Sequence, residues 1–289
     1  MAGVDLSIIL VSFNSREYLR GCLNSIYENT GHSIRYEIFV VDNNSQDQTL
    51  KMLQENYPEV RTLDNAENLG FAKANNQALR LAAGRYLLLL NSDTFVLGHA
   101  LEKMVEYMDQ HREAGALAPK LLNEDGQTTQ TQGSSWAKRQ WASPRARKVN
   151  FISGAAFLLR RETYKNVGGL DEHFFFYNED WDWCKRILKN GWEIHYFPGA
   201  AVIHYGGKST GFLGRRATVE GLRGGLYLAW KHYPLFFPLY RLGLIFFLLL
   251  LLLGNIWRAP LRRAAREKIA AYAQVIWIAL RWYNEKYYV

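Results

Sequence analysis

Cysteine is nearly absent from this sequence, which has only Cys22 and Cys184 among its 289 residues. Both lie in helical patterns, and they form neither a disulfide framework nor a Cys-x-x-Cys pair. The N-terminus leads almost directly into an apolar strand, which leaves no room for a secretory signal peptide. We therefore expect the main domain to face the cytosol.

Two familiar nucleotide-binding signatures are also missing. No glycine fingerprint follows the first predicted strand, and the sequence has no phosphate-loop lysine motif. The loop Ser12–Ser15 lacks the glycines and the arginine that a triphosphate-binding first loop needs. This disfavours a sugar-phosphate nucleotidyltransferase, which we keep as the alternative enzyme class.

Acidic residues are outnumbered, so the formal net charge is +8 and the pI is near 9.4. The basic residues cluster late in the chain, beside an apolar tail, and no nucleic-acid-binding motif accompanies them. We therefore expect no nucleic-acid partner. A membrane surface or a phosphate-rich substrate fits this charge better.

The first third of the chain alternates short apolar runs with helical periodicity. The run Tyr86–Leu90 has no polar alternation, which is typical of a central strand covered on both faces. Its neighbours complete a β-α-β pattern that indicates a parallel, nucleotide-binding half. The predicted strands are Leu6–Val11, Tyr36–Val41, Val60–Leu63, Tyr86–Leu90, Gly115–Ala118, Phe151–Leu159, Glu193–Phe197 and Ala201–His204.

Polar residues follow several of these strands. In open α/β sheets ligands bind beyond the carboxyl ends of the strands, where Asp42 and Asn91-Ser92-Asp93 fall. Asp42 is placed to accept from a ring N–H of a uracil- or thymine-type base, and a plain turn residue is the alternative. The Asn91–Asp93 motif fits a cation, a ribose or an Asx turn. We also expect Ser45 to cap a helix and Gly84 to end one.

The later part of the chain offers a base and a metal ligand. A helix beginning near Asn178 carries Glu179 and Asp180 directly after the aromatic run Phe174–Tyr177, a setting suited to a general base beside a sugar. In the same helix Asp182 can pair with Arg186. His204, at a strand end before a glycine-rich loop with Lys208, is either a metal ligand or a structural histidine.

The segment Asn123–Trp141 is polar and leads into a basic stretch with interleaved tryptophans. It is either a solvated loop or a mobile loop on the acceptor side, where Trp136 and Trp141 stack on sugar rings.

Six motifs in order resemble family-2 glycosyltransferases with a GT-A fold, over roughly residues 5–215. Within that family the sequence looks most like bacterial rhamnosyltransferases of surface-polysaccharide assembly. The motifs are Ser7–Asn14, Val40–Ser45, Asn68–Ala72, Leu90–Thr94, Gly168–Glu172 and Glu179–Asp182. The resemblance implies a Rossmann-like mixed central sheet flanked by helices.

The resemblance also implies roles for single residues. Asp180 matches the catalytic base, with Glu179 as second choice. Asp93, with His204, matches the site of Mg²⁺ or Mn²⁺, whereas Asn91 departs from the family's Asp-x-Asp motif and suits ribose better. The nucleotide-sugar positions are Ser12, Phe13, Asp42, Lys73, Asn76, Asn91, Ser92, Asp93 and Lys208.

The implied function is an inverting transfer from a nucleoside-diphosphate sugar, with dTDP-rhamnose as a candidate donor. The acceptor would be a hydroxyl of a lipid-linked or polysaccharide glycan at the cell surface. A catalytically silent membrane scaffold is the alternative outside the enzymes, and the presence of Asp93 and Asp180 argues against it.

Residues 216–289 differ in character from the catalytic domain expected at 1–215. The stretch Leu235–Trp257 is dominated by Phe, Leu and Ile, and arginines follow it. A membrane-spanning helix needs about 20 apolar residues. We expect a C-terminal helical appendage inserted into the cytoplasmic face of the membrane, with a single span and a packed core helix as alternatives.

Overall fold

A computed structural model describes residues 3–133, 138–206, 214–256 and 263–282. These residues form two compact units. The first unit comprises Met1–Asp171 and Asp180–Ser209, and the second comprises Glu172–Glu179 and Thr210–Val289. The short segment Glu172–Glu179 therefore belongs with the C-terminal helices, although it lies within the sequence of the first unit.

The first unit is built on one mixed sheet with strand order β3-β2-β1-β4-β8-β6-β9-β5, and β7 pairs with β9. Strands β1 to β4 are parallel, β8 is antiparallel to both its neighbours, and β6 is parallel to β9. This confirms the predicted mixed α/β sheet. The strands are β1 Leu6–Ser12, β2 Tyr36–Asp42, β3 Arg61–Asp64, β4 Tyr86–Leu90, β5 Thr94–Val96, β6 Ala114–Leu122, β7 Arg147–Lys148, β8 Ala156–Arg160 and β9 Glu193–His204.

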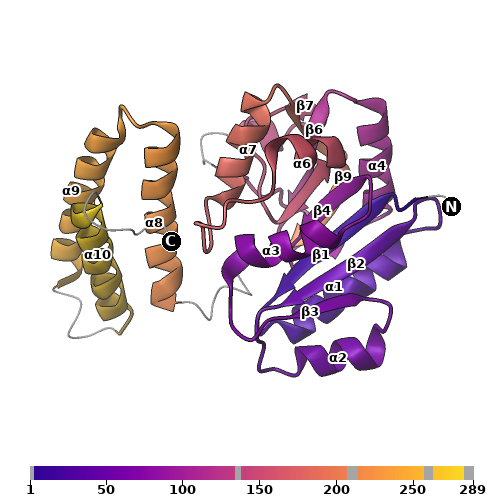
Figure 1. The fold of residues 1–289 in the computed structure, drawn as a ribbon, viewed down its shortest axis with the longest axis horizontal. Coiled ribbons are helices and arrows are strands. Elements are labelled where there is room, and N and C mark those ends of the chain that lie inside the picture. The colour runs from indigo at the N-terminus through magenta and orange to yellow at the C-terminus, as the bar shows by residue number, and fades with distance from the viewer. Residues whose placement is uncertain (1–2, 134–137, 207–213, 257–262, 283–289) are drawn as a thin grey trace. The chain divides into compact units, whose positions relative to one another are not determined.

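Helices cover both faces of this sheet (Figure 1). One core cluster joins α1, α2 and α4 to one face, and a second joins α3, α5, α6 and α7 to the other. The helices of the unit are α1 Arg16–Asn29, α2 Thr49–Asn56, α3 Gly70–Leu81, α4 Ala100–Gln110, α5 Lys138–Trp141, α6 Arg161–Val167 and α7 Glu179–Lys189.

Strand β4 is the central strand that its leucines predict. Leu88 and Leu90 point into one core cluster, and Leu87 and Leu89 into the other. All five of its residues are buried. The strand is hydrogen-bonded to parallel β1 and antiparallel β8, so the residues that follow Leu90 emerge in the middle of the sheet.

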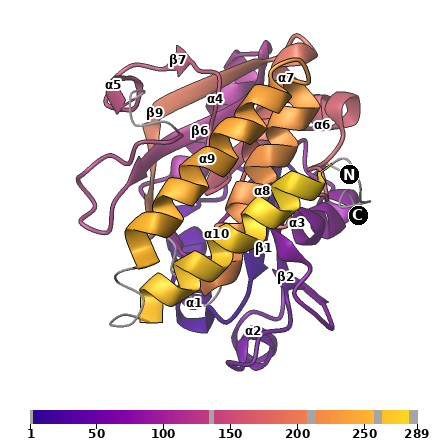
Figure 2. The same ribbon diagram turned by 90° about the vertical axis from the view of Figure 1, so that its left-hand side faces the viewer.

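The second unit consists of α8 Gly214–His232, α9 Phe237–Ile256 and α10 Arg263–Arg281, together with the segment Glu172–Glu179. The three helices share one apolar core and lie side by side (Figures 1 and 2). The predicted helical appendage is therefore present, and it contains one strongly apolar helix, α9.

Several element boundaries differ from the prediction. The residues before Ala156 are not part of β8, and the two strands predicted at the end of the domain are one strand, β9. Its register with β6 shifts between Phe197 and Ala201, which explains why the sequence suggests a break. The Ser45 cap was wrong, because α2 begins at Thr49 and the Ser45 hydroxyl accepts from the Asn14 backbone N–H.

Gly84 does not end a helix, because α3 stops at Leu81. Glycine is needed at position 84 for a different reason. A Cβ at this position would lie 2.5 Å from the Ser7 backbone nitrogen. The Gly84 N–H also donates to the Ser7 hydroxyl at 2.8 Å. Close approach of the chain entering β4 to β1 therefore requires glycine here.

Replacing Gly84 with alanine is expected to lower the free energy of unfolding by about 1–3 kcal/mol, because a buried backbone has to move. Gly21→Ala in α1 is the matched control, since a Cβ at Gly21 meets nothing within 4 Å. The control should be neutral or stabilising by up to about 1 kcal/mol. Urea denaturation measures both, and equal stability of the two variants would contradict the steric explanation.

Candidate active site

The polar strand ends predicted from the sequence gather at the carboxyl edge of the sheet. The Ser15 hydroxyl lies 3.1 Å from the hydroxyls of both Ser12 and Ser92, which joins the ends of β1 and β4 to the start of α1. The Asn91 N–H donates to the Ala155 carbonyl at 3.0 Å, which ties the same edge to the segment before β8. All these positions belong to the first unit.

Asp42, at the end of β2, is completely buried, and only one of its two carboxylate oxygens has a hydrogen-bond partner among the described residues. Its Oδ2 accepts from the Ser45 N–H at 2.8 Å, whereas its Oδ1 has no hydrogen-bond partner among the described residues. Burial raises the pKa of this carboxyl above its usual range. A buried acceptor without a donor is unfavourable, so this atom suits a ligand that brings an N–H.

An amide network surrounds Asp42. Asn43 accepts from the Asn65 side chain at 3.0 Å and donates to the Gly70 carbonyl at 3.2 Å. The Asn68 side chain in turn accepts from the Gly70 N–H at 2.9 Å. Asn43, Asn68 and Gly70, which belong to the motifs, therefore fix the loops beside Asp42.

Asp93 and His204 are brought together by the pairing of β5 with β9, in which Thr94 lies opposite His204. Asp93 Oδ1 lies 3.5 Å from His204 Nε2, and Asn91 Nδ2 lies 3.4 Å from the same ring nitrogen. Asp93 is buried and His204 is half-buried. Asn91, Asp93 and His204, which we expect around the cation and the ribose, therefore lie next to one another.

Gln130 determines which nitrogen of His204 faces Asp93. Gln130 Nε2 donates to the His204 carbonyl at 2.6 Å, so its Oε1 is the atom that lies 3.1 Å from His204 Nδ1. Because Oε1 can only accept, Nδ1 carries a proton, and Nε2 is the ring nitrogen beside Asp93. A carboxylate oxygen and an imidazole nitrogen are ligand types that suit a divalent metal.

Asp180, at the start of α7, is held by backbone donors. Its Oδ2 accepts from the Gly154 N–H at 3.2 Å, and its Oδ1 from the Trp181 N–H at 2.8 Å. Burial raises the pKa of this carboxyl to about 6. Since Ala155 contacts Asn91, the pair Gly154-Ala155 connects the carboxylate of Asp180 to the Asn91–Asp93 loop.

The Gly168–Leu170 turn is fixed from three sides. Asn76 donates to the Leu170 carbonyl at 2.8 Å and accepts from the Leu170 N–H at 2.9 Å. Arg186 donates to the carbonyls of Val167 and Gly169, and Trp183 to that of Gly168. Asn76 is thus a positioning residue, and this arrangement argues against the nucleotide contact predicted for it.

The neighbouring acidic residues have separate roles. Asp182 is fully buried and accepts from Arg186 at 2.7 Å, which confirms the predicted helical pair. Glu179 is also buried but belongs to the second unit. Of the two candidates for the base, Asp180 is the one whose carboxylate is held beside the sheet edge.

The aromatic run before α7 packs mainly within the second unit. Phe174 is buried against Tyr227 of α8, and Arg216 lies 3.9 Å above the Phe175 ring. Tyr177 and Asn178 both adopt positive φ, at 69° and 72°. Two consecutive residues of this kind mark a strained turn directly before the candidate base.

The tryptophans of the polar loop give a mixed result. Trp141 is buried and packs edge-on against Tyr196, which excludes the alternative that it stacks on a sugar and also shows that it is not solvated. Trp136 lies outside the described residues. The loop contributes Gln130 and the buried Gln132 instead, and Gln132 accepts from the Ser153 N–H at 2.9 Å. Nothing in the sequence of a polar loop distinguishes a glutamine that supports the site from one that is only solvated.

The described part of the structure defines no role for the other residues predicted to bind the nucleotide sugar, which are Lys73, Phe13 and Lys208. Lys73 is exposed on α3, and Phe13 is half-buried at the end of β1. Lys208 lies outside the described residues. Nothing in the geometry of the first two conflicts with a contact to a nucleotide.

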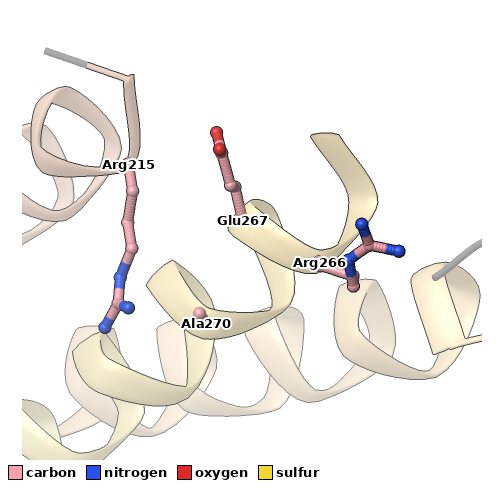
Figure 3. Close-up of a pocket in the computed structure, with 4 residues that line it drawn as sticks. All are labelled: Arg215, Arg266, Glu267 and Ala270. Carbon is pink, nitrogen blue, oxygen red and sulfur yellow. The ribbon is translucent and has the colours of Figure 1, made fainter. Parts of the chain in front are cut away.

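Two other features lie away from this edge. Glu113, Glu193 and His195 form a carboxylate–histidine group at the opposite end of β9, but both ring nitrogens of His195 are engaged, by Tyr107 and Glu193. We therefore treat this group as an ion-pair network. In the second unit, a depression of about 510 Å³ is lined by Arg215, Arg266, Glu267 and Ala270 (Figure 3).

Comparisons with known proteins agree with this arrangement. A sequence profile of glycosyl transferase family 2 matches residues 7–184. An N-acetylglucosaminyl-diphospho-decaprenol L-rhamnosyltransferase from Mycobacterium tuberculosis is 27% identical over 240 residues, which cover 71% of this chain and 78% of the relative.

Solved structures share the fold. Residues 1–349 of TarS from S. aureus, in complex with UDP, superpose with a TM-score of 0.60 at 19% identity, over 96% of this chain and 92% of that one. GalNAc-T7 with UDP, GalNAc and Mn²⁺ gives a TM-score of 0.58 at 17% identity, over 70% of this chain and 43% of that one.

The mixed sheet and its flanking helices, with the superposed structures, show the GT-A fold, and the family profile makes the chain a glycosyltransferase. More specifically, the chain belongs to glycosyl transferase family 2.

Asn76→Ala is expected to lower the free energy of unfolding by about 1–3 kcal/mol, because the buried N–H and C=O of Leu170 lose their partners. Lys73→Ala on the same helix is the control and should change stability by less than about 0.5 kcal/mol, since this side chain is exposed. Chemical denaturation measures both variants. If Asn76→Ala were as stable as the control, the anchoring role would be refuted.

Proposed function

We propose that the protein transfers a sugar, with inversion, from a nucleoside-diphosphate sugar to a hydroxyl of a lipid-linked glycan in cell-surface assembly. The observation that carries this proposal is the joining of Asp180 to the Asn91–Asp93 loop through Gly154 and Ala155. A base on one side and a donor-diphosphate position on the other are the two parts that such a transfer needs.

The donor base is expected to bind at Asp42. Oδ1 of Asp42, which has no partner among the residues that the structure describes, accepts the ring N–H of a uracil- or thymine-type base, and this bond removes the penalty of a buried, unsatisfied acceptor. Ser12 and Phe13 flank the same position, at the paired ends of β1 and β2. The rhamnosyltransferase relative supports rhamnose as the sugar and dTDP-rhamnose as the first donor to try.

Asp93 and His204 would hold Mg²⁺ or Mn²⁺, because the carboxylate oxygen Oδ1 and the ring nitrogen Nε2 lie only 3.5 Å apart. Such a cation supplies charge neutralisation for the departing diphosphate. Asn91, an amide rather than a carboxylate, stays available for the ribose. Gln130 keeps the ring of His204 in the tautomer that this role requires.

Asp180 takes the acceptor proton as the hydroxyl oxygen attacks the anomeric carbon from the face opposite the leaving group. A carboxyl with a pKa of about 6 is ionised at neutral pH, yet is more basic than an ordinary aspartate. Its two backbone donors fix its direction. We assign this chemistry to residues 1–215 and contact with the cytoplasmic membrane surface to residues 216–289.

A transfer assay tests the proposal directly. Purified protein is given dTDP-rhamnose, or UDP-sugars for comparison, with N-acetylglucosaminyl-diphospho-polyprenol as acceptor, and the glycolipid product is measured by mass spectrometry. We expect transfer from a nucleotide sugar. Absence of product with every donor would overturn the proposal.

Asp180→Asn should lower kcat by about 10²–10⁴-fold while donor binding is retained. In the unsubstituted protein, kcat/KM should rise with pH through about 6, because the base must lose its proton before it can accept another. Glu179→Gln is the matched control and should keep most of the activity. A near-normal rate for Asp180→Asn with a severe loss for Glu179→Gln would reverse the assignment of the base.

Metal binding has a readout that does not depend on turnover. Mn²⁺ titrated into the protein and followed by electron paramagnetic resonance should bind in the presence of nucleoside diphosphate, and Gln130→Ala should weaken that binding by about 10–100-fold. Gln127→Ala, an exposed position of the same loop, should leave it unchanged. Equal affinity in both variants would exclude the positioning role of Gln130.

A further inference from the structure

Helix α9 is apolar apart from Arg241 near its start and Asn255 near its end, but it is packed on one side only. Phe237 and Leu248 are buried against α8 and α10, and residues at helical spacing from them form the packed stripe. The opposite side exposes large apolar residues: Leu239, Leu242, Phe246, Phe247, Leu250 and Leu253, which we call the apolar face of α9. The exposed fractions are large, at 65% for Phe246 and 61% for Leu253.

By length and composition this helix could cross a bilayer. Its segment Phe237–Asn255 has a mean hydropathy of 2.2, and only 11% of it is buried. A helix that is apolar all round needs an apolar environment on the side that the protein leaves open. A spanning helix and a helix lying along the membrane surface both meet this need, and the neighbouring helix distinguishes them.

Charged residues of α8 lie beside the middle of α9. The two helices are joined by a short turn, and a Cβ at Gly225 would lie 3.3 Å from the Tyr240 hydroxyl, so Gly225 faces the first turns of α9. Glu220 lies five residues further along α8, and a helical rise of about 1.5 Å per residue puts it about 7.5 Å beyond this contact, toward the depth of the middle of α9. Glu220 accepts from Arg223 at 2.7 Å, and both side chains are partly buried.

The other side of α8 holds the segment that precedes the catalytic base. Arg223 donates to the His173 carbonyl at 3.4 Å, and the Asn178 side chain donates to the Gly221 carbonyl at 3.0 Å. The His173 ring stacks on Tyr227 with centroids 5.2 Å apart. If α9 spanned the bilayer, it would carry Glu220, Arg223 and this segment to the depth of the hydrocarbon. Charged groups at that depth cost about 2.5 kcal/mol or more each.

We propose that α9 lies along the surface of an anionic bilayer, with its apolar face inserted at the boundary between headgroups and acyl chains, and does not span it. Helix α8 then remains on the water side with its charges hydrated. The inference deepens the proposed function, because a lipid-linked acceptor is presented at this boundary, but its test requires no glycosyl transfer.

The flanks of α9 fit an anionic lipid surface. Arg266 and Lys268 are exposed at the start of α10, and Figure 3 shows Arg215 and Arg266 on two sides of the depression at that end of the helices. At the other end, Arg281 lies 4.6 Å above the exposed Trp277 ring. Basic residues with interfacial aromatics favour lipid headgroups over a second copy of the chain, whose own basic ends would repel these.

Flotation of the full chain with lipid vesicles tests whether the apolar face of α9 binds an anionic bilayer. Vesicles that contain phosphatidylglycerol should retain the protein at least about tenfold better than pure phosphatidylcholine vesicles, and salt should reduce the difference. Phe246→Glu with Leu250→Glu should lower the retention at least about tenfold. The control is Gln54→Glu with Asn56→Glu on α2, which adds the same charge at exposed positions. Unchanged retention after the α9 substitutions would overturn the proposal.

Depth measurements distinguish lying from spanning. Cys22 and Cys184 are buried, and burial raises the pKa of both thiols, so single cysteines introduced at Leu239, Phe246 and Leu253 can be labelled selectively. A fluorophore at each site should be quenched equally by shallow spin-labelled lipids. Deep quenching at Phe246 with shallow quenching at the two ends would show a span and overturn the proposal.

A second copy as occupant predicts a different outcome. Sedimentation without lipid would then show a dimer that Phe246→Glu with Leu250→Glu abolishes, and flotation would show no retention; this result also overturns the proposal. Circular dichroism confirms that each variant is folded. Transfer to a detergent-solubilised acceptor is unaffected by all these outcomes, so a failure here is distinguishable from a failure of the proposed function.

Discussion

The hydrogen bond from the Asn91 N–H to the Ala155 carbonyl is the contact on which the active site depends. It joins two loops that lie far apart in the sequence, one after β4 and one before β8. The first loop carries the residues proposed to bind the donor, and the second holds Asp180, the proposed base, through the Gly154 N–H. Since β4 and β8 are adjacent antiparallel strands, a shift of one would displace Asp180 from the Asn91–Asp93 loop.

The site combines fixed scaffolding with a few unsatisfied groups. The side chains of Asn43, Asn65, Asn68 and Asn76 form hydrogen bonds with backbone groups, with one another and with Gln77, so they define the shape of the loops. Within the described part of the chain, Asp42 Oδ1 remains without a donor. Both oxygens of Asp180 accept backbone N–H bonds, and burial raises the pKa of this carboxyl to about 6. Ligand binding is expected where the protein itself has left hydrogen bonding incomplete.

Much of this could be predicted from local sequence. The leucines of β4 identify a doubly covered strand, and the polar residues that follow strands must meet at one edge, because parallel strands end together. What could not be predicted depends on contacts across the fold. Gln130 matters only because β9 brings His204 to it, and the two predicted segments of β9 form one strand because the residues between Phe197 and Ala201 form an irregularity in β9 that its pairing with β6 tolerates. Trp141 looked like a surface aromatic, but tertiary packing buries it.

The segment Glu172–Glu179 has a practical consequence. It packs on α8 through Phe174 and Asn178, and Asp180 follows it directly in the chain. Shortening a protein before its apolar helices is the usual way to make it easier to purify. In this chain, a cut before α8 would also remove the surface that supports the strained turn at Tyr177 and Asn178. An inactive shortened protein would therefore say nothing about whether the membrane is needed for catalysis.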